Sequence, residues 1–552
     1  MEKKNRLVEI EIFILFLCLS CFLSVYLFQL PSNDLYYYHY YNGWAFLHNR
    51  IDIDFLPSLT RTYYNPLYDA LMYFTVEKLN NHPLVLLFVS SLKYGILMFV
   101  CYKVYDFVFK NIYKDKIFAE LFSIITAASS PILLCCITFE SNDIQSAILI
   151  MLAFYFLLKN LFKENCKSGV LIFCGVLTGL VVGLKYTNIV YAASLPLVIL
   201  ALKNQVKNPF KKIGMLILGM FFGFLITNGY WTYLLWTKFR NPVFPYLNNI
   251  FHSPFGSDYY FLYDEMRHLL PKNIFEYIFY PLLNSAERLF VGIEFKYFDL
   301  KSALTFAAIA AFVFLLKSTA VKNRINKITE INVFYALIYF VGFTYYINLL
   351  IFANVRYIIP LFMLAPVIIY IFFAVICNKK MHCYAIIMIL LLYAVTYKSR
   401  NSISKNIPWL SPHSVIQIQN LNIEDNSTVL CGTFMACYIA PAQNPNAQYI
   451  GFVMPENLSS KGFYNKDIYN MYYKNKYLEN HLGEIFKDSK NLYFIYSNLA
   501  IGLINQDLPL LEQGLSKYSN GEITKIRNCQ TVEYSVFGHR KPIYEIYVCK
   551  LK

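Results

Sequence analysis

Residues 31–44 read PSNDLYYYHYYNGW, and they follow directly on the first long hydrophobic segment of the chain. One acidic residue, Asp34, precedes a run of tyrosines at 36–41 that only His39 interrupts. In so hydrophobic a chain, a carboxylate just outside the first membrane span needs an explanation, and we take Asp34 as a candidate functional group. We interpret this stretch as one wall of a site at the membrane surface.

The composition supports a membrane environment. The 552 residues are 57% hydrophobic, 18% aromatic and 15% charged, whereas soluble domains carry about 25% charged residues. The 48 tyrosines suit the headgroup zone, since tyrosine combines an apolar ring with a polar tip. A net charge of +15 is also found in nucleic-acid binders, so the positions of the charges decide between the two classes.

Hydrophobic segments long enough to cross about 30 Å of hydrocarbon, roughly 17–25 residues each, recur along the chain. We predict eleven transmembrane helices, at about 10–30, 84–108, 118–138, 144–160, 169–186, 188–203, 213–236, 302–317, 331–351, 357–377 and 382–397.

The links between these segments alternate in charge. Every second link is rich in lysine and arginine, beginning with Lys3, Lys4 and Arg6, as the positive-inside rule requires of cytoplasmic loops. The basic charge is therefore topological, and a nucleic-acid partner is excluded. The pattern predicts an integral protein of a bacterial inner or plasma membrane, with a cytoplasmic N-terminus.

The expected organisation is mainly α, with two domains. Residues 1–397 form a polytopic transmembrane domain with outer loops at 31–83 and 237–300. Within the first loop, Leu67–Leu79 has helical apolar spacing and is expected to lie in the interface. Residues 398–552 are more polar and alternate strand-like runs (STVLCG, QYIGFV, NLYFIY, PIYEIYVCK) with helical stretches such as Asp467–Phe486. This pattern is typical of a soluble extracytoplasmic α/β domain, in which a disulfide among Cys431, Cys437, Cys529 and Cys549 is chemically feasible.

Several charged residues are candidates for function, and each has a structural alternative. Glu140 and Asp143, in the turn ESND, are either catalytic acids or helix caps. Lys93, in the second span, is either functional or a lysine that snorkels or faces a wet crevice. Lys185 and Arg356, at outer helix ends, either bind an anion or anchor their helices.

The predicted topology brings these groups and Asp34 to one side of the membrane. A carboxylate there could take the proton from an attacking hydroxyl, with Asp34 as the general base. Lys185 and Arg356 could hold a leaving phosphate, and Tyr357 joins them as a candidate. The candidates for contacts with substrate are Tyr37, His39, Arg61 and Lys93.

These motifs together resemble the GT-C superfamily of membrane glycosyltransferases, especially the branch of protein O-mannosyltransferases and lipid A aminoarabinose transferases. The resembling stretches are SNDLYYYHYYNGWAF, ESND, GLKYT, NPVFPYLN and RYIIP, spread over about residues 1–400. The resemblance implies a polyprenyl-phosphate-linked sugar donor, used on the outer face with inversion, and a glycan, lipid or protein acceptor. It places Asp34 on the first-loop catalytic aspartate, Asp143 or Glu140 on the second acidic position, and Arg356 opposite the donor phosphate.

A divalent cofactor is a further expectation of the resemblance. Many relatives carry two adjacent acids in the first loop, where this chain has Asn33 and Asp34. Mg²⁺ or Mn²⁺ favours clustered carboxylates, so a metal site here needs Asp34 and Asp143 together. Two other functions remain open: a transporter or flippase of lipid-linked saccharides, and a membrane glycan polymerase or ligase.

Overall fold

The structure is a computed structural model that describes residues 2–26, 34–112, 114–137, 140–164, 166–256, 270–284, 299–377, 387, 414–432, 436–452, 475–497, 508–537, 539–540 and 545–552. The chain divides into two compact units. Unit 1 comprises residues 1–29, 87–228 and 266–406, and unit 2 comprises residues 30–86, 229–265 and 407–552. Each unit is therefore assembled from three separate stretches of sequence.

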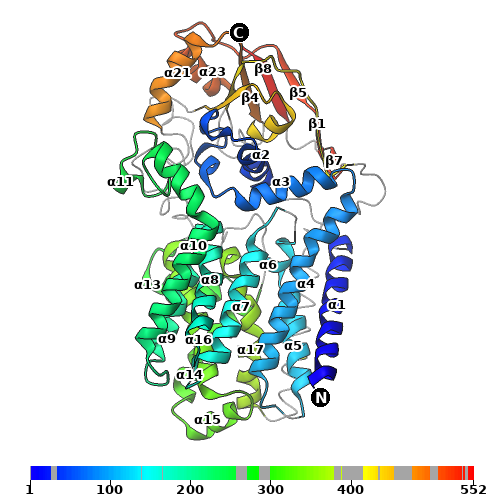
Figure 1. The fold of residues 1–552 in the computed structure, drawn as a ribbon, viewed down its shortest axis with the longest axis vertical. Coiled ribbons are helices and arrows are strands. Elements are labelled where there is room, and N and C mark those ends of the chain that lie inside the picture. The colour runs from blue at the N-terminus through cyan, green and yellow to red at the C-terminus, as the bar shows by residue number, and fades with distance from the viewer. Residues whose placement is uncertain are drawn as a thin grey trace. The chain divides into compact units, whose positions relative to one another are not determined.

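Unit 1 is a bundle of helices (Figure 1). Its elements are α1 (Glu2–Tyr26), α4 (Pro83–Val108), α5 (Lys116–Ala128), α6 (Pro131–Cys135), α7 (Asp143–Leu161), α8 (Ser168–Leu184), η4 (Tyr186–Asn188), α9 (Ile189–Ala201), α10 (Pro209–Phe239), α13 (Ile274–Asn284), α14 (Lys301–Leu315), α15 (Thr319–Asn326), α16 (Ile331–Ile351), η6 (Val355–Ile358) and α17 (Ile359–Ile376). The first residues of α4 and the last of α10 belong to unit 2.

Six stretches among the described residues are long and apolar enough to cross a membrane: Arg6–Val25, Pro83–Val108, Asp143–Leu161, Pro209–Phe239, Ile331–Ile351 and Val355–Ile376. Three shorter apolar helices accompany them, at Ser168–Leu184, Tyr186–Ala201 and Lys301–Leu315. The chain is thus an integral membrane protein. Length and hydrophobicity together select six spans among the described residues, so the predicted count of eleven is not confirmed. The segment predicted at 382–397 lies outside the described residues apart from Ile387.

The third predicted span, 118–138, is wrong as a single helix. The structure has α5 up to Ala128 and a separate short α6 from Pro131. Ser130 between them is extended, with φ −63° and ψ 122°, because a proline excludes the helical conformation from the residue before it. Each of the other nine predicted spans within the described residues overlaps one α-helix.

The helices of unit 1 differ in how much of their surface they bury. In α17 and η6 together, 83% of the apolar window is buried, whereas the corresponding share in α1 is 11%. The helix α17 packs against α5, α7, α14 and α16, so it forms the centre of the bundle. The apolar side chains of α1 remain on the surface, as expected for a helix that faces lipid.

Glycines set the distance between α8 and α10. A Cβ atom on Gly175 would lie 2.1 Å from the carbonyl oxygen of Leu216, and one on Gly179 would lie 2.0 Å from that of Met220. Both distances are far below van der Waals contact, so the two backbones touch directly. Small residues permit this close helix packing in membranes.

Unit 2 combines helices with two sheets (Figure 1). Its helical elements are η1 (Leu35–His39), α2 (Tyr40–Leu47), η2 (Arg50–Asp52), η3 (Leu59–Tyr63), α3 (Leu67–Leu79), α11 (Asn248–Phe251), η8 (Ala436–Ala442), α21 (Lys476–Asp488) and α23 (Leu508–Tyr518). Its strands are β1 (Ile416–Ile418), β2 (Thr428–Cys431), β3 (Gln448–Gly451), β4 (Leu492–Ser497), β5 (Cys529–Val532), β6 (Tyr534–Val536), β7 (His539–Arg540) and β8 (Ile546–Lys550).

The main sheet has the order β3-β2-β4-β8-β5. Strand β2 runs parallel to β3 and β4, whereas β8 is antiparallel to β4 and β5. Buried side chains of α21 and α23, such as Leu482 and Leu515, share a core with Phe494 of β4. The four strand-like runs predicted in the tail are confirmed as β2, β3, β4 and β8, and the predicted helix at 67–79 is confirmed as α3. A disulfide joins Cys529 to Cys549, while Cys431 and Cys437 are buried and form no disulfide.

A buried ion pair ties the first loop to β3 inside unit 2. Arg50 donates from Nε and Nη2 to both carboxylate oxygens of Asp54, at 2.8 and 2.6 Å. Arg50 also donates to the carbonyls of Pro445 and Ala447, each at 2.5 Å. Phe55 then pairs with Ile450 as a parallel bridge. The loop is therefore part of the same folded unit as the C-terminal sheet.

Candidate active site

The ESND turn places a carboxylate among cations in unit 1. The helix α7 begins at Asp143, whose side chain is buried. Its Oδ1 lies 2.5 Å from Lys185 Nζ, and its Oδ2 lies 3.2 Å from Arg356 Nε. Asn142, at the N-cap position of α7, makes no side-chain capping hydrogen bond. The carboxylate of Asp143 thus forms ion pairs with two cations, Lys185 and Arg356.

Local backbone structure brings Lys185 and Arg356 to this point. Lys185 follows the last residue of α8 and is extended, with φ −153° and ψ 110°, which ends the helix and turns the chain into η4. Arg356 lies in η6, where the Asn354 side chain accepts a hydrogen bond from the backbone N–H of Arg356 at 3.0 Å. Because η6 packs against α7, α16 and α17, the guanidinium is held beside the start of α7.

Lys93 contacts the ESND turn, which begins at Glu140. Both side chains are buried. Lys93, from the middle of α4, donates from Nζ to the carbonyl of Ser141 at 2.7 Å and interacts electrostatically with Glu140 and Asp143. This lysine neither snorkels nor faces open water. It anchors the ESND turn from within the bundle.

The cluster of Lys93, Glu140, Asp143, Lys185 and Arg356 carries three cations against two carboxylates. In this largely buried setting, electrostatic interactions are stronger than in water. Tyr357 belongs to the same cluster, since Lys185 Nζ lies 5.0 Å from the centroid of its ring. The arrangement is suited to binding an anionic group at the end of α7.

The remaining candidates, Asp34, Tyr37, His39 and Arg61, lie together in unit 2. The guanidinium of Arg61 lies 5.6 Å from the centre of the Tyr37 ring, a cation–π contact. His39 is buried, and its Nδ1 lies 2.6 Å from Oδ1 of Asp69. Asp34 immediately precedes η1 and is half-buried.

Asp69 was missed by the sequence analysis. Burial raises the pKa of its carboxyl above 3.8, the contacts of His39 and Asn42 lower it in part, and the charge of Asp34 adds to the rise. Asp69 is thus electrostatically coupled to both Asp34 and His39. A signal for it exists in the sequence, because Asp69 falls on the helical stripe of Met72, Tyr73 and Val76, a face that is otherwise apolar.

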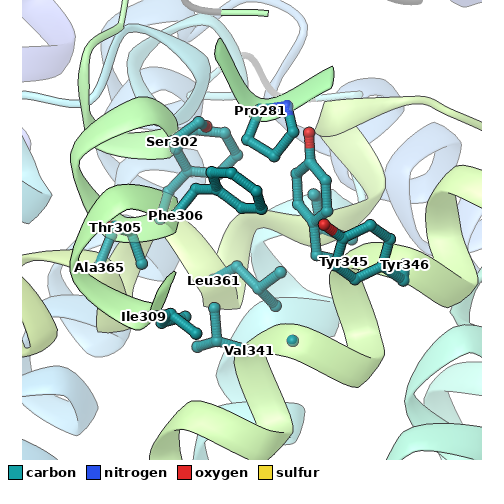
Figure 2. A pocket seen from close by; sticks show the side chains of 13 residues that line it. Pro281, Ser302, Thr305, Phe306, Ile309, Val341, Tyr345, Tyr346, Leu361 and Ala365 are labelled. Atoms are coloured by element: carbon teal, nitrogen blue, oxygen red, sulfur yellow. The ribbon is translucent and has the colours of Figure 1, made fainter. Parts of the chain in front are cut away.

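An apolar cavity of about 90 Å³ adjoins η6 in unit 1. Side chains of α14, α16 and α17, among them Phe306, Val341 and Leu361, line it (Figure 2). Ile358, two residues after Arg356, is also part of its wall. A narrow apolar space therefore lies close in the fold to the cationic cluster.

The predicted metal ligands fit a divalent cation poorly. Both carboxylate oxygens of Asp143 already contact cations, so a metal ion bound there would be repelled by Lys185 and Arg356. Within the described part of the chain, no group of three or more His, Cys, Asp or Glu side chains has the arrangement of a metal site.

Comparisons with known proteins give distant likenesses only. No family model matches the chain, and no curated protein matches it significantly. Among solved structures, it is similar to ArnT from Cupriavidus metallidurans bound to undecaprenyl phosphate, at 14% identity and a TM-score of 0.41 over 98% of this chain and 97% of that one.

It is also similar to the archaeal oligosaccharyltransferase AglB from Archaeoglobus fulgidus, in complex with an inhibitory peptide and a dolichol-phosphate. The identity is 14% and the TM-score 0.45, over 87% of this chain and 69% of that one.

Proposed function

We propose that this protein is an integral-membrane glycosyltransferase. It transfers a sugar from a polyprenyl-phosphate donor to a glycan, lipid or protein acceptor on the outer face of the membrane. The observation that carries the proposal is the pairing of Lys185 and Arg356 on one buried carboxylate, Asp143. Such a site suits the phosphate of a lipid-linked sugar.

The cations have complementary roles in this proposal. Arg356 presents a planar guanidinium that can bond a phosphate through two N–H groups, and Lys185 adds a compact point charge. Asp143 orients both cations before the donor arrives, so little rearrangement is needed as charge develops on the leaving phosphate. Lys93 holds the ESND turn, and with it Asp143, in place.

The apolar cavity beside η6 supports a lipidic donor. Its walls come almost wholly from hydrocarbon groups, such as those of Phe306, Ile309 and Leu361. A narrow space of this kind accepts a thin apolar chain and excludes a hydrated sugar. A donor with its phosphate at Arg356 would have an apolar surface available for the first part of its chain.

The chemical step is a single displacement. The acceptor hydroxyl oxygen forms a bond to the anomeric carbon, and the bond from that carbon to the phosphate oxygen breaks with its electron pair passing to the phosphate. Asp34 takes the hydroxyl proton as general base. Attack from the face opposite the leaving group inverts the anomeric configuration. Tyr37, His39 and Arg61 are the proposed contacts to the sugars.

A donor-release assay tests the proposal. Purified protein in lipid nanodiscs is incubated with a panel of polyprenyl-phosphate sugars and an acceptor-containing extract, and free polyprenyl phosphate is measured by mass spectrometry. We expect release by the wild type and none by Asp34→Asn, a change that preserves the size of the side chain. Hydrogen exchange of both proteins checks that the variant remains folded.

The outcomes separate the competing functions. Release by folded Asp34→Asn at the wild-type rate would remove Asp34 as the base. Binding of a donor without release by the wild type would favour a transporter of lipid-linked saccharides. A product lengthened by repeated addition of the same unit would favour a glycan polymerase.

A further inference from the structure

A second cavity, remote in sequence from the cationic cluster, lies wholly within unit 2. It has a volume of about 670 Å³ and lies between α21, the segment 51–55 and the β3 side of the main sheet. This volume is in the range of small-molecule sites, about 300–1,000 Å³. We propose that this cavity binds a saccharide that carries no anionic group.

One face of α21 supplies a row of side chains to the cavity. Tyr477, His481, Glu484 and Asp488 all line it, and their spacing of three and four residues places them on one side of the helix. The rings of Tyr477 and His481 stack with their centroids 4.0 Å apart. His481 donates from Nδ1 to the carbonyl of Tyr477 at 2.7 Å, which holds the ring in place.

The opposite wall adds a third ring and planar polar groups. Phe55 packs edge-on against Tyr477 with ring centroids 5.4 Å apart. The amides of Asn426 and Gln448 line the same space and are exposed. Rings that contact C–H faces, together with amides and carboxylates that bond hydroxyl groups, provide the interactions that a sugar offers in return.

The charge of the cavity disfavours anionic ligands. Four carboxylates line it, those of Asp52, Asp54, Glu484 and Asp488. Asp54 is paired with Arg50 and Asp52 with Lys238, so the balance of the lining comes from Glu484 and Asp488 against one lysine, Lys490. Phosphates, nucleotides and uronic acids would therefore be repelled. Among the described residues, no three acidic, cysteine or histidine side chains converge as in a metal site. A neutral or amine-bearing sugar fits this charge pattern.

A peptide bound as an added strand is disfavoured at this place. The outer edge of β3 is already occupied, because Phe55 donates its N–H to the carbonyl of Tyr449 at 3.1 Å and accepts from the N–H of Gly451 at 2.8 Å. The main-chain groups that strand addition requires are thus in use. Recognition in this cavity has to come from side chains.

Saturation-transfer NMR on the full-length protein tests the proposal. The protein is placed in lipid nanodiscs, since the maltose headgroup of common detergents would itself compete. The probes are N,N′-diacetylchitobiose, the corresponding deacetylated disaccharide, a glucuronic-acid disaccharide and trilysine. No lipid-linked donor is present, so the result is independent of the proposed transferase activity.

We expect saturation transfer to the first two probes and not to the glucuronic-acid disaccharide. Tyr477→Ala, which removes the stacking ring, should lower the affinity about fivefold to tenfold. Glu484→Gln should weaken binding of the deacetylated disaccharide more than binding of N,N′-diacetylchitobiose. Asn480→Ala, an exposed position of the same helix outside the cavity, should bind like the wild type.

Three results would overturn the proposal. The first is no saturation transfer to either sugar at millimolar concentrations. The second is wild-type affinity in both Tyr477→Ala and Glu484→Gln. The third is binding of trilysine at least as tight as that of the deacetylated disaccharide, which would mean that the cavity selects positive charge alone. Because Glu484 is exposed, its variant remains informative even if Tyr477→Ala fails to fold.

Discussion

Replacing Asp54 with asparagine should destabilise unit 2 strongly, although the two side chains have nearly the same size. Asp54 is 5% exposed and Arg50 is 4% exposed. Besides the two bonds from Arg50, the carboxylate accepts from the hydroxyl of Tyr41 at 2.7 Å and from the N–H of Tyr449 at 2.8 Å. Asparagine supplies one acceptor oxygen in place of two and no negative charge.

The expected loss follows from the buried guanidinium. Breaking a buried ion pair by removing one partner costs about 3–5 kcal/mol, because the remaining charge is uncompensated. Arg50 keeps its bonds to the carbonyls of Pro445 and Ala447, which places the loss near the lower end, at about 3 kcal/mol. Burial raises the pKa of Asp54 above 3.8, and Arg50 offsets this in part.

Hydrogen exchange measured by mass spectrometry reports this loss of stability peptide by peptide. Each 1.4 kcal/mol of lost stability raises the exchange rate about tenfold, so a loss of about 3 kcal/mol should make the amides of β3 exchange about 100-fold faster in Asp54→Asn. Asp52→Asn is the matched control. Asp52 lies two residues away, is exposed, and pairs with Lys238 at the surface. Such a pair contributes about 0–1 kcal/mol, so β3 should exchange at a rate close to that of the wild type.

Equal exchange rates in the two variants would refute this reasoning. They would mean that the Arg50–Asp54 pair contributes no more than a surface pair. Faster exchange in unit 1 peptides but not in β3 would refute it as well, since the contacts of Asp54 lie within unit 2.

Three other predictions concern the donor site, the Asp69 carboxyl and the disulfide. Arg356→Ala should raise KM for the donor by about tenfold to 100-fold, since hydrogen bonds to charged groups contribute about 1.5–3 kcal/mol. The control Lys317→Ala, at an exposed position, should leave KM unchanged. Steady-state kinetics with the donor found in the release assay measures both values. Burial raises the pKa of Asp69 above 3.8, so the folded state holds this proton to higher pH than the unfolded state, and the stability that Asp69 contributes falls as pH rises from about 3.8 through the folded pKa. Asp69→Asn should lack this slope, and identical slopes of wild type and variant in denaturant unfolding across that pH range would contradict it. Reduction of the Cys529–Cys549 bridge, which joins residues 20 apart in sequence, should lower the free energy of unfolding by about 2–4 kcal/mol; an unchanged denaturation midpoint in reductant would count against this.

Patterns of hydrophobicity predicted most of the helices because the features of a membrane span lie within a short stretch of sequence. Length, apolar composition and flanking lysines suffice to place a segment such as Ile331–Ile351. The failure at 118–138 is also local in origin, since the effect of Pro131 on the preceding residue was left out. The strands β2, β3, β4 and β8 were found for the same reason, as short apolar runs between polar residues.

Contacts between distant residues could be predicted only in part. The alternation of loops across the membrane indicated that Asp143, Lys185 and Arg356 share one side, and the structure brings them into contact. No such argument links Arg50 to Ala447, which is 397 residues away. The spacing of Arg50 and Asp54 is that of an ion pair on a helix, yet nothing in the pattern shows that the pair is buried.

The glycine contact between α8 and α10 limits where this sequence can vary. Along α1, which buries little of its surface, one apolar residue can replace another without consequence for the bundle. At Gly179, a single added methyl group would have to displace a backbone oxygen that lies 2.0 Å from its position. Since Lys185 directly follows α8, such a substitution would shift the lysine as well. We therefore expect substitutions to be tolerated along the lipid-facing side of α1 and to be rejected at Gly179, where the backbone of a neighbouring helix leaves no space for a side chain.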